Sequence, residues 1–190
     1  MQIKKQLIFM WLFVFAVYLP FAIYMILRFD VTRTPISLIG WSVGGLRYLI
    51  IYITLTLPFC LYLVYFFNKH FLGNRKFIKV LSAISSIFVA IGAFIPLRET
   101  GVNLITLYAH TIISVGGSIL LMLTILYALI LHALTKKHKI LILSLYGIYV
   151  AALLTAFYIL YTAALFQLMA SLSFFLILLF LNTMVLYRQV

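Results

Sequence analysis

The chain has 190 residues, of which 67% are hydrophobic and only 8% are charged. Because soluble domains carry about 45–50% apolar and about 25% charged residues, this composition excludes a water-soluble globular domain. Fourteen Lys and Arg residues against two acidic residues give a net charge of +12, which in a soluble protein would indicate nucleic acid binding. Here the basic residues lie in short clusters between long apolar segments, as in the loops of membrane proteins. We therefore expect membrane lipids, and no nucleic acid, as partners.

The apolar segments have the length of membrane-spanning helices. A hydrocarbon core of about 30 Å and a rise of about 1.5 Å per residue require about 20 residues per crossing. The uncharged stretch 140–187 would be roughly 72 Å long as one helix, so it must turn back. We place this turn at 161–167, where the side chains of Thr162 and Gln167 can form hydrogen bonds with the backbone of a tight turn. The expected helices are about 7–27, 48–67, 80–97, 107–131, 140–161 and 167–187.

These segments predict an all-α integral membrane bundle of six transmembrane helices that forms a single domain over 1–190. With alternating crossings, ten Lys and Arg residues fall on the side of the termini and four on the other side. The positive-inside rule then places both termini in the cytoplasm of a multi-pass protein of the cell membrane.

The type of basic residue differs between the two sides. All eight lysines fall on the cytoplasmic side, whereas four of the six arginines and both acidic residues fall on the outer side. In one interpretation, Asp30 and Glu99 pair with the arginines and hold the outer loops. In the other, two acids leave four arginines partly unneutralised, and the guanidinium groups bind an anionic lipid or lipid-like ligand. The candidate ligand-binding residues are Arg28, Asp30, Arg33, Arg47, Arg98 and His110.

Two further functions remain open. His110 and Glu99 are candidates for an acid/base pair in a lipid-modifying enzyme, although an intramembrane histidine also commonly bonds to a neighbouring helix. Alternatively, the chain is a small integral subunit that requires partner subunits of a larger membrane complex or transporter. We expect no metal and no cofactor, because the other histidines lie at the cytoplasmic ends of the helices, too far from His110.

Small residues indicate where the helices approach each other closely. Gly40 and Gly44 form a GxxxG pattern before the second expected helix, and Ser114 and Ser118 flank Gly116 and Gly117 in the fourth. Such residues favour helix contacts in membranes, where burial of apolar surface gives little driving force.

The run GAFIP at 92–96, a short outer loop, and His110 followed by the small residues 114–118 resemble a bacterial six-helix membrane family of unknown function. That family is similar to the eukaryotic DRAM and Sfk proteins, which also carry an outer histidine at the start of their fourth helix. Segment 35–40 resembles their first outer loop. The resemblance implies a role in membrane lipid organisation or remodelling. Those proteins usually have an Asp soon after the proline, a position at which this chain has Leu97, Arg98 and Glu99.

Overall fold

The computed structural model describes residues 2–42, 44–95, 104–136, 139–160 and 164–188, and every structural statement below concerns these residues. Most of these residues are helical, and none of them forms a strand. In chain order the elements are α1 (Gln2–Leu12), η1 (Phe13–Tyr18, a π-helix), α2 (Leu19–Arg28), α3 (Ile36–Trp41), α4 (Leu46–Phe71), α5 (Lys76–Phe94), α6 (Leu104–His110), η2 (Thr111–Val115, a π-helix), α7 (Gly116–Leu134), α8 (Lys139–Leu160) and α9 (Ala164–Arg188).

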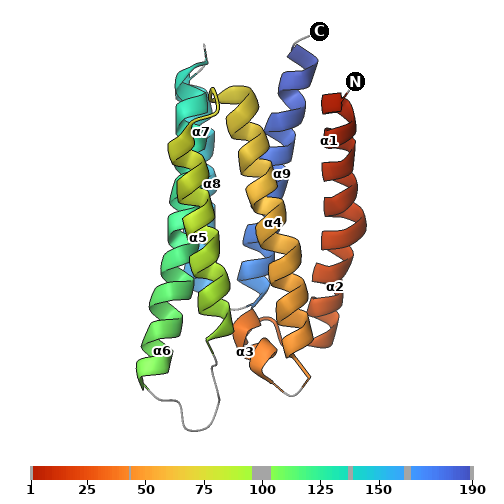
Figure 1. Ribbon diagram of the computed structural model, residues 1–190, viewed down its shortest axis with the longest axis vertical. Helices are drawn as coiled ribbons and strands as arrows, with labels where there is room; N and C mark the ends of the chain where they lie inside the picture. Colours follow the sequence, from red (N-terminus) through yellow and green to blue (C-terminus); the bar gives the residue numbers. More distant parts are fainter. Residues whose placement is uncertain (1, 43, 96–103, 137–138, 161–163, 189–190) are drawn as a thin grey trace.

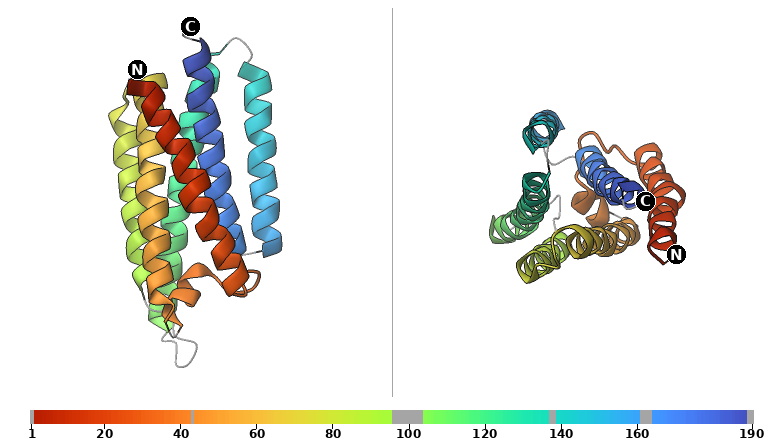
Figure 2. Two further views of the ribbon diagram at one scale, coloured as in Figure 1. Left: turned by 90° about the vertical axis from the view of Figure 1, so that its right-hand side faces the viewer. Right: turned by 90° about the horizontal axis from the view of Figure 1, so that it is seen from above.

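The elements form an elongated bundle of roughly parallel and antiparallel helices (Figure 1). Within the described residues, five helices are long and apolar enough to cross a membrane: Ile3–Arg28, Leu46–Phe71, Lys76–Phe94, Leu104–Leu134 and Ala164–Thr183. The predicted all-α membrane bundle is therefore confirmed at this level. α8 contacts α7 and α9 at the edge of the bundle (Figure 2), and its shorter apolar stretch Leu143–Thr155 leaves the sixth crossing untested.

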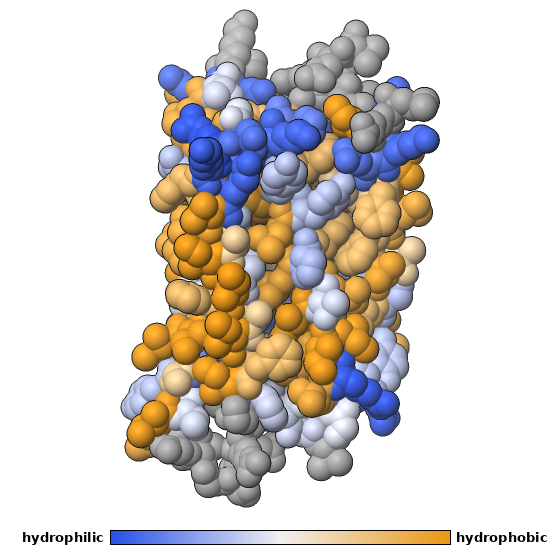
Figure 3. Space-filling view, in the orientation of Figure 1, coloured by the Kyte–Doolittle hydropathy of each residue, from blue (hydrophilic) through white to orange (hydrophobic). Residues whose placement is uncertain are grey.

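The chain termini lie at one end of the bundle, and α3 lies at the other (Figure 1). We call these the termini end and the α3 end. In the face seen in Figure 3, hydrophilic side chains form a broad belt at the termini end, and a largely hydrophobic band separates it from a smaller hydrophilic area at the α3 end. This distribution is that of a membrane-spanning bundle.

The expected helix boundaries need correction by a few residues. α4 and α7 extend past the predicted spans, since polar residues at their ends continue the helix toward the headgroup region. α5 ends earlier than predicted, at Phe94. A proline disfavours helical backbone at the residue before it, and Ile95, which precedes Pro96 in the sequence, is extended. Gln167 does not belong to the turn before the last helix, because α9 already begins at Ala164. The remainder of that predicted turn, 161–163, lies outside the described residues.

The first long helix is continuous from α1 to α2 but contains the π-helical segment η1. Pro20 stands at the start of α2 and cannot donate a backbone hydrogen bond. A wider turn just before a proline relieves the clash between its ring and the preceding carbonyl groups. The tyrosine at the end of η1, Tyr18, is fully buried and donates a hydrogen bond to the carbonyl oxygen of Leu168 at 3.2 Å. This bond joins the first helix to α9.

The short helix α3 was not predicted, and it folds under the bundle at the α3 end (Figure 1). The loop before it accepts the first free N–H groups of α9: Ala164 donates to Thr34 at 2.9 Å, and Leu165 donates to Val31 at 2.8 Å. Gln167 in turn accepts a hydrogen bond from the Ile36 N–H at 3.2 Å. The start of α9 is thus satisfied by tertiary contacts.

Close helix contacts occur at several of the expected small residues. A Cβ atom on Gly117 would lie 2.8 Å from the Phe88 Cβ, and one on Gly92 would overlap the backbone of Ser114. α5 therefore packs tightly along η2 and α7. The GxxxG pattern is only partly a packing motif. Gly40 faces Leu49 across the α3–α4 contact, whereas Gly44 has a positive φ of 73° with open space around it and serves the turn between the two helices.

Candidate functional site

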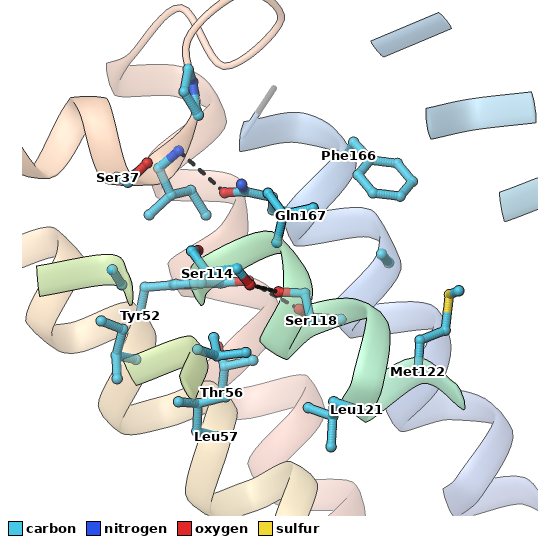
Figure 4. A pocket seen from close by; sticks show the side chains of 18 of the residues that line it. Ser37, Tyr52, Thr56, Leu57, Ser114, Ser118, Leu121, Met122, Phe166 and Gln167 are labelled. Carbon is cyan, nitrogen blue, oxygen red and sulfur yellow. Dashed lines mark hydrogen bonds between the residues drawn. The ribbon is translucent and has the colours of Figure 1, made fainter. Parts of the chain in front are cut away.

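A cavity of about 560 Å³ lies inside the half of the bundle nearest the α3 end. Its walls come from α4, α5, the α6–η2–α7 helix and α9, and α3 closes it from below. Figure 4 shows side chains from these separate elements around the same space. The volume falls within the range of about 300–1,000 Å³ that is usual for small-molecule sites.

The cavity wall combines apolar side chains with uncharged hydrogen-bonding groups. The polar groups include the hydroxyls of Ser37, Tyr52, Thr56 and Ser171 and the amide of Gln167. Within the part of the chain that the structure describes, no Lys, Arg, Asp or Glu lines this space. Such a wall suits a ligand with an apolar body and an uncharged polar group, because an unpaired ion would lose its hydration there without a counter-charge.

Thr56 is the polar residue of the cavity that most clearly lacks a protein partner. Its side chain is only 7% exposed, and its Oγ1 atom makes no hydrogen bond of normal geometry with the described residues, although the Tyr18 and Tyr52 hydroxyls lie near enough to interact with it weakly. Beside it in the wall, the Tyr52 and Ser171 hydroxyls lie 3.1 Å apart and bond to each other. A buried hydroxyl without a partner costs about 1–3 kcal/mol, so a ligand that bonds to Thr56 would recover part of that cost.

The cavity reaches the surface of the bundle along the α6–η2–α7 helix. Tyr108, Thr111 and Ser118 line the cavity and are also exposed, with 62% of the Tyr108 side chain accessible. The π-helical segment η2 begins at Thr111 and widens the turn that carries Thr111 and Ser114. Ser118 donates to the carbonyl oxygen of Ser114 at 2.9 Å (Figure 4). A ligand could therefore enter sideways, from the apolar surroundings of the bundle.

His110 lines the cavity, and one nitrogen of its ring contacts a backbone carbonyl oxygen. The side chain is 7% exposed, and Nδ1 lies 3.2 Å from the carbonyl oxygen of Ile95, the residue that follows α5. This contact satisfies one of the free carbonyl groups at the end of a helix. The predicted partner Glu99 lies outside the described residues. The structure thus supports a structural role for the histidine, and the acid/base pair stays a prediction.

The predicted cluster of outer arginines does not form one pocket with His110. Arg28, Arg33 and Arg47 are exposed at the α3 end and do not line the cavity. Arg47 donates from Nη2 to the Tyr48 hydroxyl at 2.8 Å, and neither residue lines the cavity. Arg98 lies outside the described residues. The sequence could not resolve this separation, because it depends on the direction in which each side chain leaves its helix.

Asp30 bonds within its own loop. Its Oδ1 atom accepts hydrogen bonds from the Thr32 hydroxyl at 2.6 Å and from the Thr32 N–H at 3.3 Å. These hydrogen bonds lower the pKa of the Asp30 carboxyl below its ordinary value, and the nearby charge of Arg33 lowers it further. Asp30 therefore bonds to Thr32 rather than forming the expected ion pair with an arginine, and the Arg33 charge acts on its carboxyl only from a distance.

No group of three His, Cys, Asp or Glu side chains that could hold a metal ion occurs among the described residues. The one cysteine, Cys60, is buried and forms part of the cavity wall.

The residues that shape the cavity were missed by the sequence analysis. Thr56 lies more than 100 residues before Gln167 and Ser171, so no local pattern joins them. One sequence feature does point to these residues. They are hydroxyl and amide side chains inside apolar spans, where each requires a hydrogen-bond partner.

Comparison of the chain with models of protein families, with curated proteins and with solved structures found no match. The resemblance to the bacterial six-helix family related to DRAM and Sfk therefore stays a prediction.

Proposed function

We propose that this chain is a multi-pass membrane protein that binds a lipid or lipid-like amphiphile at its α3 end, without catalysing a reaction on it. The observation that carries the proposal is the 560 Å³ cavity inside an apolar bundle, with an uncharged polar wall and a buried Thr56 hydroxyl that makes no hydrogen bond of normal geometry with the described residues. The apolar part of the ligand fills the cavity, and its hydroxyl or carbonyl group bonds to Thr56.

The membrane topology belongs to the same proposal. α8 is the remaining crossing, because it is 22 residues long and contains a single charged residue, Lys139, at its start. Six crossings agree with the two termini at one end of the bundle, and the lysine-rich termini end is the cytoplasmic side. The α3 end then faces outward from the cell membrane, and the cavity opens in the outer leaflet.

Two variants test ligand binding in the cavity. Thr56→Val removes only the Thr56 hydroxyl, which makes no hydrogen bond of normal geometry with the described residues. We expect this variant to retain roughly two- to tenfold less of the co-purifying amphiphile, the effect of one neutral hydrogen bond. Ala170→Phe fills space in the wall and should abolish retention. The matched control is Thr124→Val, since Thr124 is also buried but bonds to the Leu120 carbonyl and does not line the cavity.

The measurement is mass spectrometry of lipids extracted from protein purified in a mild detergent, compared with lipids of the source membrane. We expect wild type and Thr124→Val to carry one uncharged amphiphile enriched above its membrane abundance. Equal retention by Ala170→Phe, or a wild-type extract that only mirrors the membrane, would reject the proposal.

The other two functions gain no specific support. An enzyme using His110 would act through Nε2, since Nδ1 contacts the Ile95 carbonyl oxygen, and its predicted partner Glu99 lies outside the described residues. A role as a subunit of a larger complex remains a prediction, and a stoichiometric protein partner in the same purification would be the evidence for it.

A further inference from the structure

A second surface at the α3 end carries two arginines and is separate from the cavity. It lies where α2 meets the start of α4. The Tyr24 hydroxyl, on α2, and the Tyr48 hydroxyl, on α4, lie 3.0 Å apart and bond to each other. The Phe29 ring packs edge-on against Tyr48 with 5.1 Å between centroids. These aromatic contacts hold the ends of two membrane-spanning helices in a defined arrangement.

Arg47 is fixed on this surface by two contacts. Its Nη2 atom donates to the Tyr48 hydroxyl at 2.8 Å, and its guanidinium carbon lies 4.8 Å from the centre of the Tyr48 ring. Arg28 ends α2 next to the same tyrosines, and the positive charges of both arginines act on the Tyr24 and Tyr48 hydroxyls. Because Arg28 follows Tyr24 by one helical turn and Arg47 contacts Tyr48, each tyrosine of the pair has one arginine beside it.

No carboxylate of the described residues forms an ion pair with either arginine. Asp30, the nearest acid in sequence, bonds to Thr32 instead. The free N–H groups at the start of α4, whose N-cap Gly45 offers no side-chain cap, add a further partial positive charge on this side. Two neighbouring cations without an acid are stabilised by an external anion, and planar guanidinium groups match the oxygens of a phosphate.

We propose that Arg28 and Arg47, with the Tyr24–Tyr48 pair between them, form a binding site for the phosphate group of an anionic membrane phospholipid. Interfacial tyrosines and arginines are suited to the headgroup level of a bilayer. Leu27 is 81% exposed and Leu46 is 43% exposed, so apolar surface for the acyl chains adjoins the arginines. This site is independent of the cavity, because none of its residues lines that space.

The test uses detergent-purified full-length protein titrated with phosphatidylglycerol or with phosphatidylcholine, with bound lipids counted by native mass spectrometry. Wild type should prefer phosphatidylglycerol. The double variant Arg28→Gln/Arg47→Gln should bind it roughly tenfold or more weakly, as expected for the loss of charged hydrogen bonds. The matched control is Arg33→Gln, which removes an exposed arginine of the same end that has no contact with the tyrosine pair. It should retain the preference of wild type.

Two further arms make the outcome decisive. Arg28→Lys/Arg47→Lys keeps both charges but loses the bidentate geometry, so its affinity should fall between those of wild type and the Gln variant. Added inorganic phosphate separates a lipid site from a site for a soluble anion. If millimolar phosphate displaces phosphatidylglycerol completely, the site binds the free anion and the lipid assignment is overturned. Equal binding by the Gln variant and wild type would overturn the site itself.

This result is distinguishable from failure of the proposed function. The Gln variant leaves Thr56 and the cavity wall intact, so retention of the uncharged amphiphile should stay at the wild-type level while the preference for phosphatidylglycerol is lost.

Discussion

Gly116 and Gly117 are neighbours in α7, yet a methyl group added at each would meet different surroundings. Gly117 is buried against α5, where an added Cβ would lie 2.8 Å from both the Phe88 Cβ and the Val89 nitrogen. Gly116 faces open space, with no described atom within 4 Å of the point that a Cβ would occupy. Adjacent residues of the same type therefore have different roles, since a helix turns by about 100° per residue.

Substitution of the two glycines by alanine should consequently have opposite effects. Gly117→Ala forces α5 and α7 apart, and overpacking of this kind costs about 1–3 kcal/mol. Gly116→Ala adds no clash and should leave stability unchanged or slightly raised, by up to about 1 kcal/mol, because alanine favours helix. Thermal unfolding of the two variants in the same detergent provides the measurement. Equal shifts in Tm would show that the α5–α7 contact is looser than the structure indicates.

At the scale of elements, α3 packs against α4, and hydrogen bonds tie α3 and the loop before it to the start of α9. The bonds from Ala164 and Leu165 to Thr34 and Val31 join the two segments, and Gln167 accepts the first N–H of α3. Because α3 has only six residues, it is too short to be stable alone, and tertiary contacts maintain it. The floor of the cavity thus depends on a helix that is distant in sequence.

Gln167→Leu should therefore loosen α3 while leaving the long helices intact. The change removes the acceptor for the Ile36 N–H, so amide hydrogen exchange should accelerate at residues 36–41. Met169→Leu is the control, because Met169 is exposed on the same helix and 57% of its side chain is accessible. Exchange followed by mass spectrometry in detergent gives the comparison. Unchanged protection of α3 in Gln167→Leu would mean that packing against α4 and the α9 backbone contacts hold α3 without the Gln167 side chain.

At the scale of the whole molecule, the bundle has two chemically different ends separated by an apolar band. The α3 end carries the cavity opening and the exposed arginines 28, 33 and 47, whereas the described lysines lie at the termini end. This polarity gives the protein a defined direction in a membrane. The cavity and the arginine surface consequently face the same leaflet.

Labelling of single cysteines in a Cys60→Ser background tests this topology. Ser42→Cys, in the exposed segment after α3, should react with a membrane-impermeant maleimide added to intact cells. Thr135→Cys, at the end of α7, should react only after the membrane is permeabilised. Peptide tags at the two termini should be protected together, as six crossings require. Protection of only one terminal tag would establish an odd number of crossings and exclude α8 as a spanning helix.

The sequence by itself determined the class of protein and the approximate position of its long helices. Hydropathy is a sum over neighbouring residues, and the length of a crossing depends only on bilayer thickness and helix rise, so neither requires tertiary information. Some local details also followed from residue type, such as the tight contact at Gly117. The ends of the helices were less accurate, because polar residues can extend a helix into the headgroup region or end it at a proline.

Only the tertiary structure decided where the chemistry lies. The predicted topology places four arginines and His110 on the same side of the membrane, and for that reason the sequence predicts one cationic pocket. In the folded protein His110 lines an uncharged cavity, while Arg28 and Arg47 lie outside it beside Tyr24 and Tyr48. The physical reason is that a site is assembled by the rotation of each helix about its own axis and by packing between distant segments. Small shifts in that rotation move a side chain from the cavity to the lipid-facing surface.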